Sequence, residues 1–354
     1  MTEYKFQTKS SVHIMKKIHI IFTGGTIAMQ TNDQGLLIPA VTGDELLKSI
    51  PALQHVGEIS TQQFSNQPSA QMTPELMLLL REEIISIFST TETEGIVIVH
   101  GTDTMEETAF FLDASLSDTQ LQNNPVIITG AMRSNDQASA DGMANLLAAT
   151  QVAADSHSKE RGVMVVMNDE IHSARYVKKM DTSSLQTFSS PQYAALGKIS
   201  HVATRTPVQY NQPATRLIET IDVPRETFEI PRIDIVQMYT GADATHLNAS
   251  IEAGAQAVII QAVGASSVNL ALYEGIQHAI SQGTAIIISS RSPLGECAPV
   301  YGYIGGGQTL KALGACFSAD LPAHKARLYA QLLLSSKNNA TNRLETIQNG
   351  FSAL

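Results

Sequence analysis

The stretch 23–28 (TGGTIA) combines two hydroxyl side chains with two adjacent glycines, directly after the apolar run 18–22 (IHIIF). The run predicts a buried strand and the glycines a tight turn. Thr26 is then expected just beyond a strand end, where open α/β sheets bind their ligands. One interpretation is a hydroxyl nucleophile beside an oxyanion hole of backbone N–H groups. The other is a structural Gly-rich turn or a phosphate-binding loop, although neither G-x-G-x-x-G nor Gly-Lys-Ser/Thr is present.

The same plan recurs further along the chain. The buried run 95–99 (GIVIV) is followed at once by 100–107 (HGTDTMEE). Thr102 or Asp103 is expected to cap the next helix, with two glutamates near its positive N-terminal end. A plain helix cap with an acidic first turn is the simpler interpretation, and a polar site at the strand end is the alternative.

Lys179 lies in the stretch 175–180 (RYVKKM), after the apolar strand 162–167 (GVMVVM). A solvated surface lysine is the usual case. Beside Thr102 and Asp103, however, a desolvated lysine can lose its proton and serve as a base. The aspartate would then orient the lysine or hold a substrate ammonium group.

The elements that must position these residues alternate between strands and helices. A third strand is expected at 126–129 and a helix at 139–154, while 29–42 is expected to be a polar loop. Continuously apolar strands that alternate with helices indicate a parallel sheet covered on both faces. We predict an α/β protein of two α/β domains, the larger N-terminal one with a mostly parallel, doubly wound sheet and the smaller C-terminal one with a parallel sheet.

Prolines and polar residues suggest where the two domains meet. The expected parts are an N-terminal extension (1–14), a catalytic α/β domain (15–205), a linker (206–231) and a C-terminal α/β domain (232–354). In the last part, strands are expected near 233–238, 256–262 and 284–289. The segment 323–335 mixes leucine with basic residues at helical spacing, which is typical of a surface helix packed on this domain.

The composition limits the classes of partner. Acidic residues number 33 against 23 basic ones, giving a formal charge of −10, and no basic block is present. This argues against nucleic acid or a membrane as the main partner and leaves small-molecule substrates. The two cysteines, Cys297 and Cys316, lack metal-type spacing and are too few for a disulfide framework, although a single bridge stays open. They favour a reducing cytoplasm, and we expect no cleaved secretion signal.

The stretches 23–28 and 95–105 resemble the two signatures of the bacterial-type L-asparaginase family. The resemblance continues through 130–133 (GAMR), 139–142 (SADG) and 165–169 (VVMND) into the second domain, over about residues 17–340. It implies hydrolysis of the side-chain amide of L-asparagine to aspartate and ammonia, without metal or organic cofactor.

The resemblance also implies roles for individual residues. Thr26 is similar to the family's primary nucleophile, and Thr102, Asp103 and Lys179 are similar to its second triad. The expected substrate-binding residues are Ser69 for the α-carboxylate, its neighbour Ala70, Thr102, Asp103 for the α-ammonium, and Ala131 through its backbone carbonyl.

Two departures from the family pattern stand close to the expected site. The family's lid tyrosine has no match, since no tyrosine occurs between Thr26 and Ala70. Ala70 itself stands where the family usually has glutamine. These departures favour the intracellular branch of the family.

The resemblance further implies a homo-oligomer, either a dimer or a dimer of dimers. The loop 263–269 of the second domain corresponds to one that reaches the active site of a neighbouring subunit, with Asn269 as the expected contact and Glu296 as a second candidate. Two other functions remain open: a glutaminase-asparaginase or an amidotransferase subunit, and a module that binds an amino acid without turnover.

Overall fold

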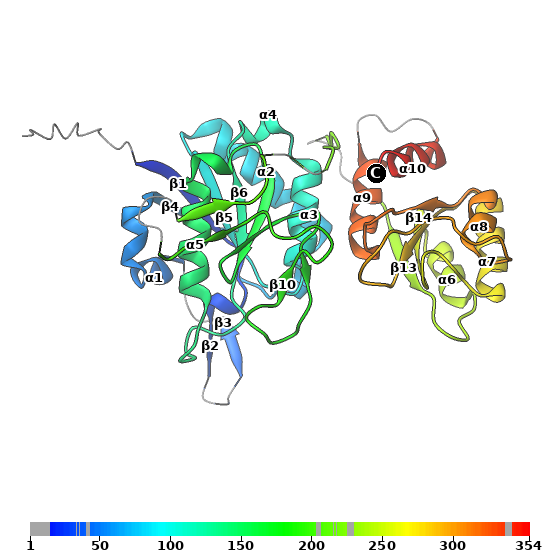
Figure 1. Ribbon diagram of the computed structural model, residues 1–354, viewed down its shortest axis with the longest axis horizontal. Coiled ribbons are helices and arrows are strands. Elements are labelled where there is room, and N and C mark those ends of the chain that lie inside the picture. Colours follow the sequence, from blue (N-terminus) through cyan, green and yellow to red (C-terminus); the bar gives the residue numbers. More distant parts are fainter. Residues whose placement is uncertain are drawn as a thin grey trace, which may run out of the picture.

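The computed structural model describes residues 15–354 apart from 33, 35, 40–42, 203–206, 215, 217, 225–229 and 337–341. The expected N-terminal extension, residues 1–14, lies outside the described residues. The described chain forms two α/β domains that stand side by side (Figure 1). This confirms the predicted fold class.

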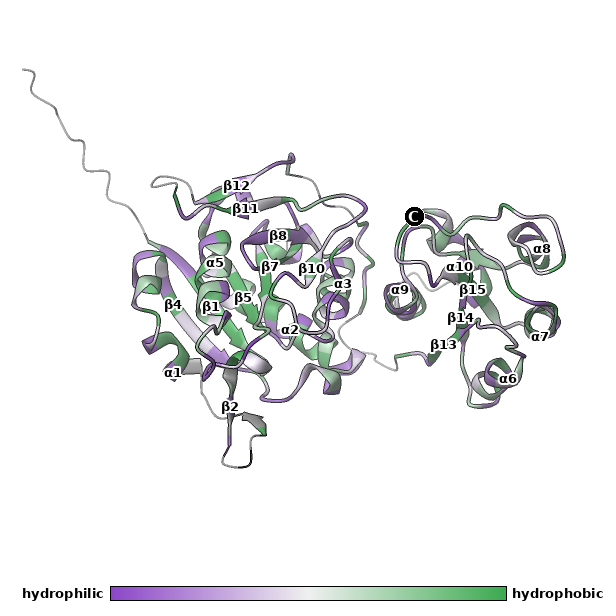
Figure 2. Ribbon diagram, turned by 60° about the horizontal axis from the view of Figure 1, so that its bottom comes forward, coloured by the Kyte–Doolittle hydropathy of each residue, from purple (hydrophilic) through white to green (hydrophobic). Residues whose placement is uncertain are grey.

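The first domain is built on an eight-stranded sheet with the order β12-β11-β8-β7-β6-β5-β1-β4. Its strands are β1 (Lys16–Phe22), β4 (Gly57–Gln63), β5 (Gly95–Val99), β6 (Val126–Thr129), β7 (Val163–Met167), β8 (Glu170–Ser173), β11 (Gly197–Ile199) and β12 (Val208–Tyr210). The five strands from β7 to β4 are parallel, and the three at the other edge are antiparallel. The central strands are continuously apolar, green in Figure 2, because both faces of the sheet are buried.

Helices cover this sheet on its two faces. They are α1 (Gly43–Lys48), α2 (Pro74–Thr90), α3 (Met105–Ser115), α4 (Asp118–Leu121) and α5 (Gly142–Ala154). Helix α5 contacts β1, β5, β6 and β7, and α3 contacts β6 and β7. Helix α2 begins where expected, because Thr73 Oγ1 accepts the Leu76 N–H and a proline takes the first helical position.

Two short hairpins extend from the first domain. The segment 29–42, expected to be a loop, contains β2 (Met29–Thr31) and β3 (Leu37–Pro39), which pair and project away from the sheet (Figure 1). The second hairpin pairs β9 (Lys178–Lys179) with β10 (Phe188–Ser189). It carries the lysine that the sequence singled out.

The second domain has a four-stranded parallel sheet with the order β13-β14-β15-β16. Its elements are β13 (Ile233–Gln237), α6 (Thr245–Glu252), β14 (Ala257–Ala262), α7 (Leu270–Ser281), β15 (Ala285–Ser290), α8 (Gly307–Leu313), β16 (Cys316–Phe317), α9 (Ala323–Ser335) and α10 (Arg343–Ser352). The three strands expected in this domain are therefore present. The expected linker 206–231 is wrong in part, because its residues Val208–Tyr210 form β12. This strand pairs with β11 and belongs to the first sheet.

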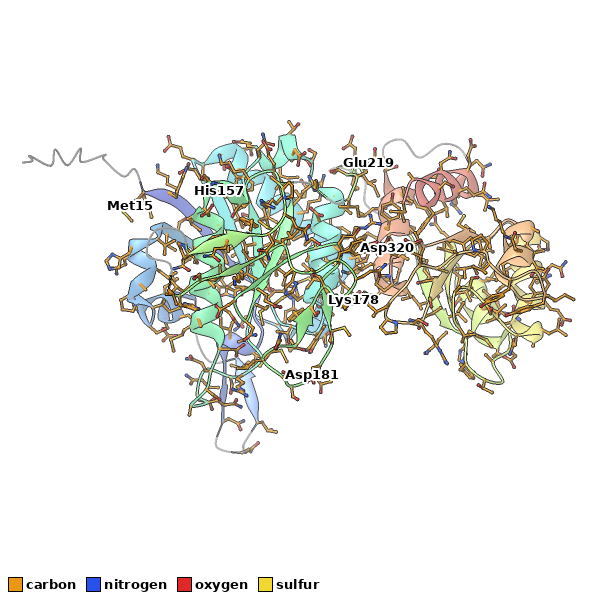
Figure 3. All side chains as sticks on the ribbon, viewed as in Figure 1. Met15, His157, Lys178, Asp181, Glu219 and Asp320 are labelled. Carbon is orange, nitrogen blue, oxygen red and sulfur yellow. The ribbon has the colours of Figure 1, made fainter. Side chains whose placement is uncertain are left out.

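Helix α9 packs on its own domain as predicted, but it is not a surface helix. It packs on β13, β14 and β15 of its own domain and, on its other side, against α3 of the first domain. Figure 3 shows Lys178 and Asp320 at this junction between the domains. Because both sides of α9 are covered, Leu328, Leu332, Leu334 and even Lys325 are buried.

No helix within the described part of the chain combines the length and apolar character needed to cross a membrane.

Candidate active site

The ends of β1 and β5 meet through their glycines. A Cβ placed on Gly25 would lie 2.6 Å from the Cα and N of Gly101, so the two backbones are in direct contact. Gly25 also has φ of 93°, a conformation that glycine adopts at little cost. Thr26 and Thr102, the next residues on each strand end, therefore leave the sheet from the same point.

A third segment joins these strand ends. A Cβ on Gly101 would lie 2.8 Å from the Cβ and Oγ of Ser69, and one on Gly24 would lie 2.6 Å from the backbone of Gln67. Ser69 begins a short 3-10 helix, Ser69–Gln71, that includes Ala70. The buried Ser69 Oγ accepts the backbone N–H of Asp103 at 3.2 Å. Residues 69 and 70 are thus fixed beside the Thr102 loop.

The helix after this loop does not use the expected cap. Thr104 is the N-cap residue of α3, and its hydroxyl donates to the backbone oxygen of Ser69 at 2.7 Å instead of capping the helix. Thr102 and Asp103 precede the cap, so their side chains are directed to another partner. The acidic first turn, Glu106 and Glu107, is present as expected.

Lys179 is the partner of the Thr102 and Asp103 side chains. Its Nζ lies 2.9 Å from Thr102 Oγ1 and 2.6 Å from Asp103 Oδ1. The lysine side chain is 15% exposed and the aspartate side chain 71% exposed. The three groups predicted to act together are therefore in hydrogen-bond contact, although 76 residues or more separate the lysine from the other two.

The sequence does not predict which group holds the backbone of Lys179 in place. The backbone N–H of Lys179 donates to Glu106 Oε2 at 3.1 Å. Burial alone would raise the pKa of Glu106, but a hydrogen bond from His324 and the charge of Lys325 bring that pKa below its usual value. Both side chains come from α9 of the second domain, a contact for which the sequence carries no local signal.

The end of β6 contributes Ala131. A Cβ on Gly142 would lie 2.5 Å from Ile27 Cγ1 and 3.3 Å from Ala131 Cβ, which places Ala131 beside the residue that follows Thr26. The loop is held by Asp141, whose carboxylate accepts the backbone N–H groups of Met132 and Arg133.

Asn269 and Glu296, the two residues expected from the second domain, lie away from the strand-end cluster. Asn269 caps α7: its Oδ1 accepts the Leu272 N–H at 2.9 Å, and its Nδ2 donates to Ala242 O at 2.6 Å. Helix α7 lies on the side of its domain away from the first domain (Figures 1 and 2). Glu296 is exposed in the loop after β15. The structure of one chain therefore does not bring either residue to the strand-end cluster.

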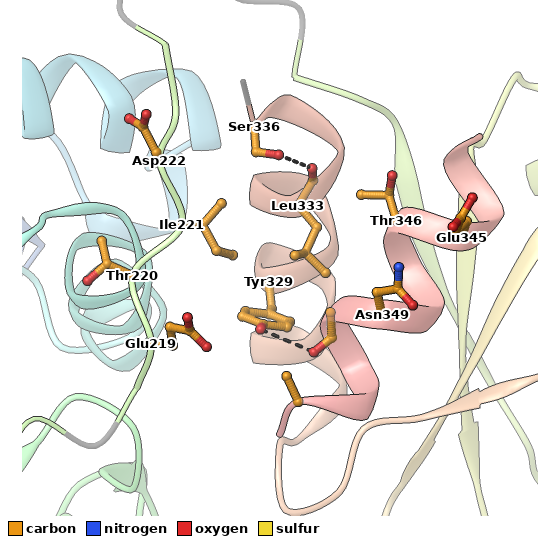
Figure 4. Close-up of a pocket in the computed structure, with 12 residues that line it drawn as sticks. Glu219, Thr220, Ile221, Asp222, Tyr329, Leu333, Ser336, Glu345, Thr346 and Asn349 are labelled. Carbon is orange, nitrogen blue, oxygen red and sulfur yellow. Dashed lines mark hydrogen bonds between the residues drawn. The ribbon is translucent and has the colours of Figure 1, made fainter. Parts of the chain in front are cut away.

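Two hollows in the structure are candidates for a substrate pocket. One, of about 330 Å³, is lined by Asp103, Lys179 and their neighbours Glu106 and 180–182. The other, of about 300 Å³, lies between the segment 219–222 and helices α9 and α10 (Figure 4). Its lining includes three carboxylates and no basic side chain, so it does not suit a substrate with a carboxylate.

The described site contains no cluster of side chains of the kind that binds a metal ion. Within the described ranges of the chain, no group of three or more His, Cys, Asp or Glu side chains is arranged to hold a metal ion.

The comparisons with known proteins match both domains. Residues 17–215 match the family described as "Asparaginase, N-terminal", and residues 232–349 match "Glutaminase/Asparaginase C-terminal domain". The chain is 32% identical to the L-asparaginase of Bacillus licheniformis, over 91% of this chain and 96% of that one. It is 33% identical to the probable periplasmic L-asparaginase of Haemophilus influenzae, over 91% and 89%.

A solved structure agrees with these sequence matches. The crystal structure of the probable cytoplasmic L-asparaginase from Campylobacter jejuni has a TM-score of 0.81 and 31% identity, covering 95% of this chain and 99% of that one. The chain therefore belongs to the bacterial-type L-asparaginase family of amidohydrolases.

Proposed function

We propose that the protein hydrolyses the side-chain amide of L-asparagine to L-aspartate and ammonia, with Thr26 as nucleophile and Thr102, Asp103 and Lys179 as a second triad. The observation that supports this most directly is the contact of Lys179 Nζ with Thr102 Oγ1 and Asp103 Oδ1. Gly25 and Gly101, in contact with each other, put Thr26 at the same strand ends. A lysine held against a hydroxyl is the arrangement expected of a base and the group that it activates.

The reaction needs two transfers of the acyl group. Thr26 Oγ1 attacks the amide carbon, its proton is taken up by a base, and the amide nitrogen leaves as ammonia after it is protonated. Water then attacks the ester on Thr26, and Lys179 accepts its proton through Thr102; the bond between the acyl carbon and the Thr26 oxygen breaks, and this oxygen takes up a proton as it leaves. Water thus supplies the oxygen of the new carboxylate, and the threonine hydroxyl is restored.

The same cluster offers groups for both charged ends of asparagine. Ser69 accepts the Asp103 N–H through its oxygen, so its own O–H remains available to donate to the α-carboxylate. The exposed carboxylate of Asp103 suits the α-ammonium, with Ala70 next to the serine. The backbone oxygen of Ala131 would accept the N–H of the side-chain amide.

Among the described residues, Asn269 and Glu296 of the same chain do not reach these strand ends, so we propose that a neighbouring chain supplies a wall of the pocket. We infer a homo-oligomer, a dimer or a dimer of dimers, in which Asn269 and less directly Glu296 approach the site of a neighbouring chain. Large apolar side chains near both residues are exposed, at Leu270, Leu294 and Val300. Light scattering at assay concentrations tests this: an active monomer would contradict the inference.

Ammonia release from L-asparagine and from L-glutamine, measured under the same conditions, tests the proposed reaction. We expect turnover of asparagine and at most a side activity on glutamine. Higher turnover of glutamine would favour a glutaminase-asparaginase, and binding of asparagine without ammonia would favour a module that senses the amino acid. The similarity to the probable cytoplasmic enzyme of Campylobacter jejuni supports a cytoplasmic location.

A further inference from the structure

Lys325 on α9 is fully buried between the two domains. Its Nζ donates to three backbone oxygens of the first domain, those of Ala174 (2.9 Å), Arg175 (3.0 Å) and Val177 (2.7 Å). Three acceptors match the three N–H donors of an ammonium group, whereas a neutral amine has only two. Burial lowers the pKa of Lys325 to about 8, so the ammonium form still predominates at neutral pH.

All three acceptors lie in one short segment of the first domain. The segment 174–177 ends one residue before β9, which contains Lys179. The neighbouring ion pair between Arg175 and Asp320, 2.6 Å long, joins the same segment to the residues before α9. If Lys325 only joined the two domains, its three hydrogen bonds would not all need to end within residues 174–177, the segment that leads to Lys179.

The same helix end also contacts the other support of Lys179. His324 Nε2 lies 3.3 Å from Glu106 Oε1, and the second oxygen of this carboxylate accepts the Lys179 backbone N–H. Adjacent residues of α9 therefore reach both sides of the lysine's backbone: Lys325 the segment before it, and His324 the carboxylate that holds its N–H.

We propose that Lys325, with His324, is a positioning residue through which the second domain sets the backbone of Lys179 and so keeps its Nζ in reach of Thr102 and Asp103. The proposal rests on the proposed function, in which Lys179 is the base. A catalytic group needs its backbone fixed as well as its side chain, since a displacement of about 1 Å can reduce a rate by about 100-fold. Lys325 touches no reacting group and acts only through Lys179.

A double-mutant cycle in the full-length protein tests this. Lys325→Met removes the three donors while keeping a long apolar side chain. We expect kcat for asparagine, calculated from the concentration of folded protein, to fall about tenfold or more. KM should change by less than about threefold. In the Lys179→Met background the same substitution should cause no further loss, because there is no base left to position.

Arg327→Met is the matched control. Arg327 lies on the same helix and donates to a backbone oxygen as well, but to Ile233 in its own domain, at 2.9 Å. Its loss should leave kcat nearly unchanged. If Lys325→Met does not fold, as judged by circular dichroism, His324→Ala takes its place in the cycle, since it frees Glu106 with less disturbance of buried groups.

The outcomes separate this inference from the proposed function. Normal turnover in Lys179→Met alone would overturn the role of the lysine and this inference with it. A large loss in Lys179→Met without a loss in Lys325→Met or His324→Ala would overturn only the inference. The inference would also fail if the loss were equal in both backgrounds, or if Arg327→Met lost as much, because both results describe a general structural role.

Discussion

Both domains place glycines and hydroxyls at the ends of parallel strands, yet the contacts of these polar groups at the proposed site differ from those at the ends of β14 and β15. In the second domain, Ser266 Oγ donates to Ala298 O, Ser290 Oγ donates to Gly264 O, and both ends of the Asn269 amide bind backbone groups. In the first, Lys179 contacts the side chains of Thr102 and Asp103, which come from another strand end. Hydroxyls that bind their own domain's backbone hold loops, whereas side chains that bind each other across strand ends can pass protons.

Lys179→Met should have the largest effect among changes that leave Thr26 in place. It removes the amine that contacts Thr102 and Asp103 at the strand ends of the first domain. We expect kcat to fall by about 100-fold or more, the range typical of losing a general base, while aspartate binds almost as before. Steady-state ammonia release and calorimetric titration with aspartate measure the two quantities. Equal losses of turnover and binding would show that the lysine binds substrate instead.

Asp103→Asn should act mainly on binding. It keeps the shape of the side chain but removes the charge proposed to hold the α-ammonium. We expect KM for asparagine to rise by about tenfold or more, since hydrogen bonds to charged groups contribute about 1.5–3 kcal/mol. An unchanged KM would mean that the ammonium is bound elsewhere.

The first domain should also make the fold sensitive to acid through two buried histidines, His100 and His172. Burial lowers the pKa of each to about 4, from 6.5. Between these pH values the unfolded chain binds more protons than the folded one. The free energy of unfolding is therefore fully retained above pH 6.5 and falls as the pH drops toward 4, by about 3 kcal/mol for each histidine.

Urea denaturation at several pH values between 7 and 4 measures this decline. His172→Asn is the test variant, because asparagine keeps a partner for Ser190 Oγ, which lies 3.0 Å from Nδ1. Glu170 lies 3.4 Å from Nε2 but is partly exposed, so burial decides the direction of the shift. The variant should lose less stability than the wild type over the same range. Parallel curves would show that His172 is not a source of the acid sensitivity.

The second domain's thiols should have the smallest effect. Burial raises the pKa of Cys297 to about 12 and that of Cys316 to about 11, so little thiolate forms at neutral pH. Treatment with iodoacetamide at pH 7.5 should leave ammonia release unchanged, and mass spectrometry should find both thiols unmodified. Rapid loss of activity together with alkylation would place reactive chemistry in the second domain.

The sequence predicts best what depends on local pattern. The strand before Thr26 and the one before Thr102 are recognisable because each is a mostly apolar run that is followed two residues later by glycine. The sequence predicts Thr102 or Asp103 as the cap of α3, whereas Thr104 takes that position, because threonine and aspartate can both cap a helix and the three residues are consecutive. The contact of Thr102 and Asp103 with Lys179 depends on tertiary structure.

What the sequence does not predict depends on contacts made far along the chain. Lys325 lies among leucines at helical spacing and resembles a surface residue, but three backbone oxygens from the other domain make its burial tolerable. Helix α10 is mostly polar and buries only Ile347 and Phe351, so little of its sequence indicates contact with the core. Strand β12 has three residues and forms only because β11 is there to pair with it.

Ammonia release from L-asparagine by the wild type and by Thr26→Ala tests the central claim most directly. The substitution removes one hydroxyl from a partly buried position and should leave circular dichroism and thermal unfolding unchanged. If the strand-end cluster of the first domain performs the hydrolysis with Thr26 as nucleophile, turnover should fall by more than about 1,000-fold. Turnover at the wild-type rate in the purified, folded variant would contradict the account.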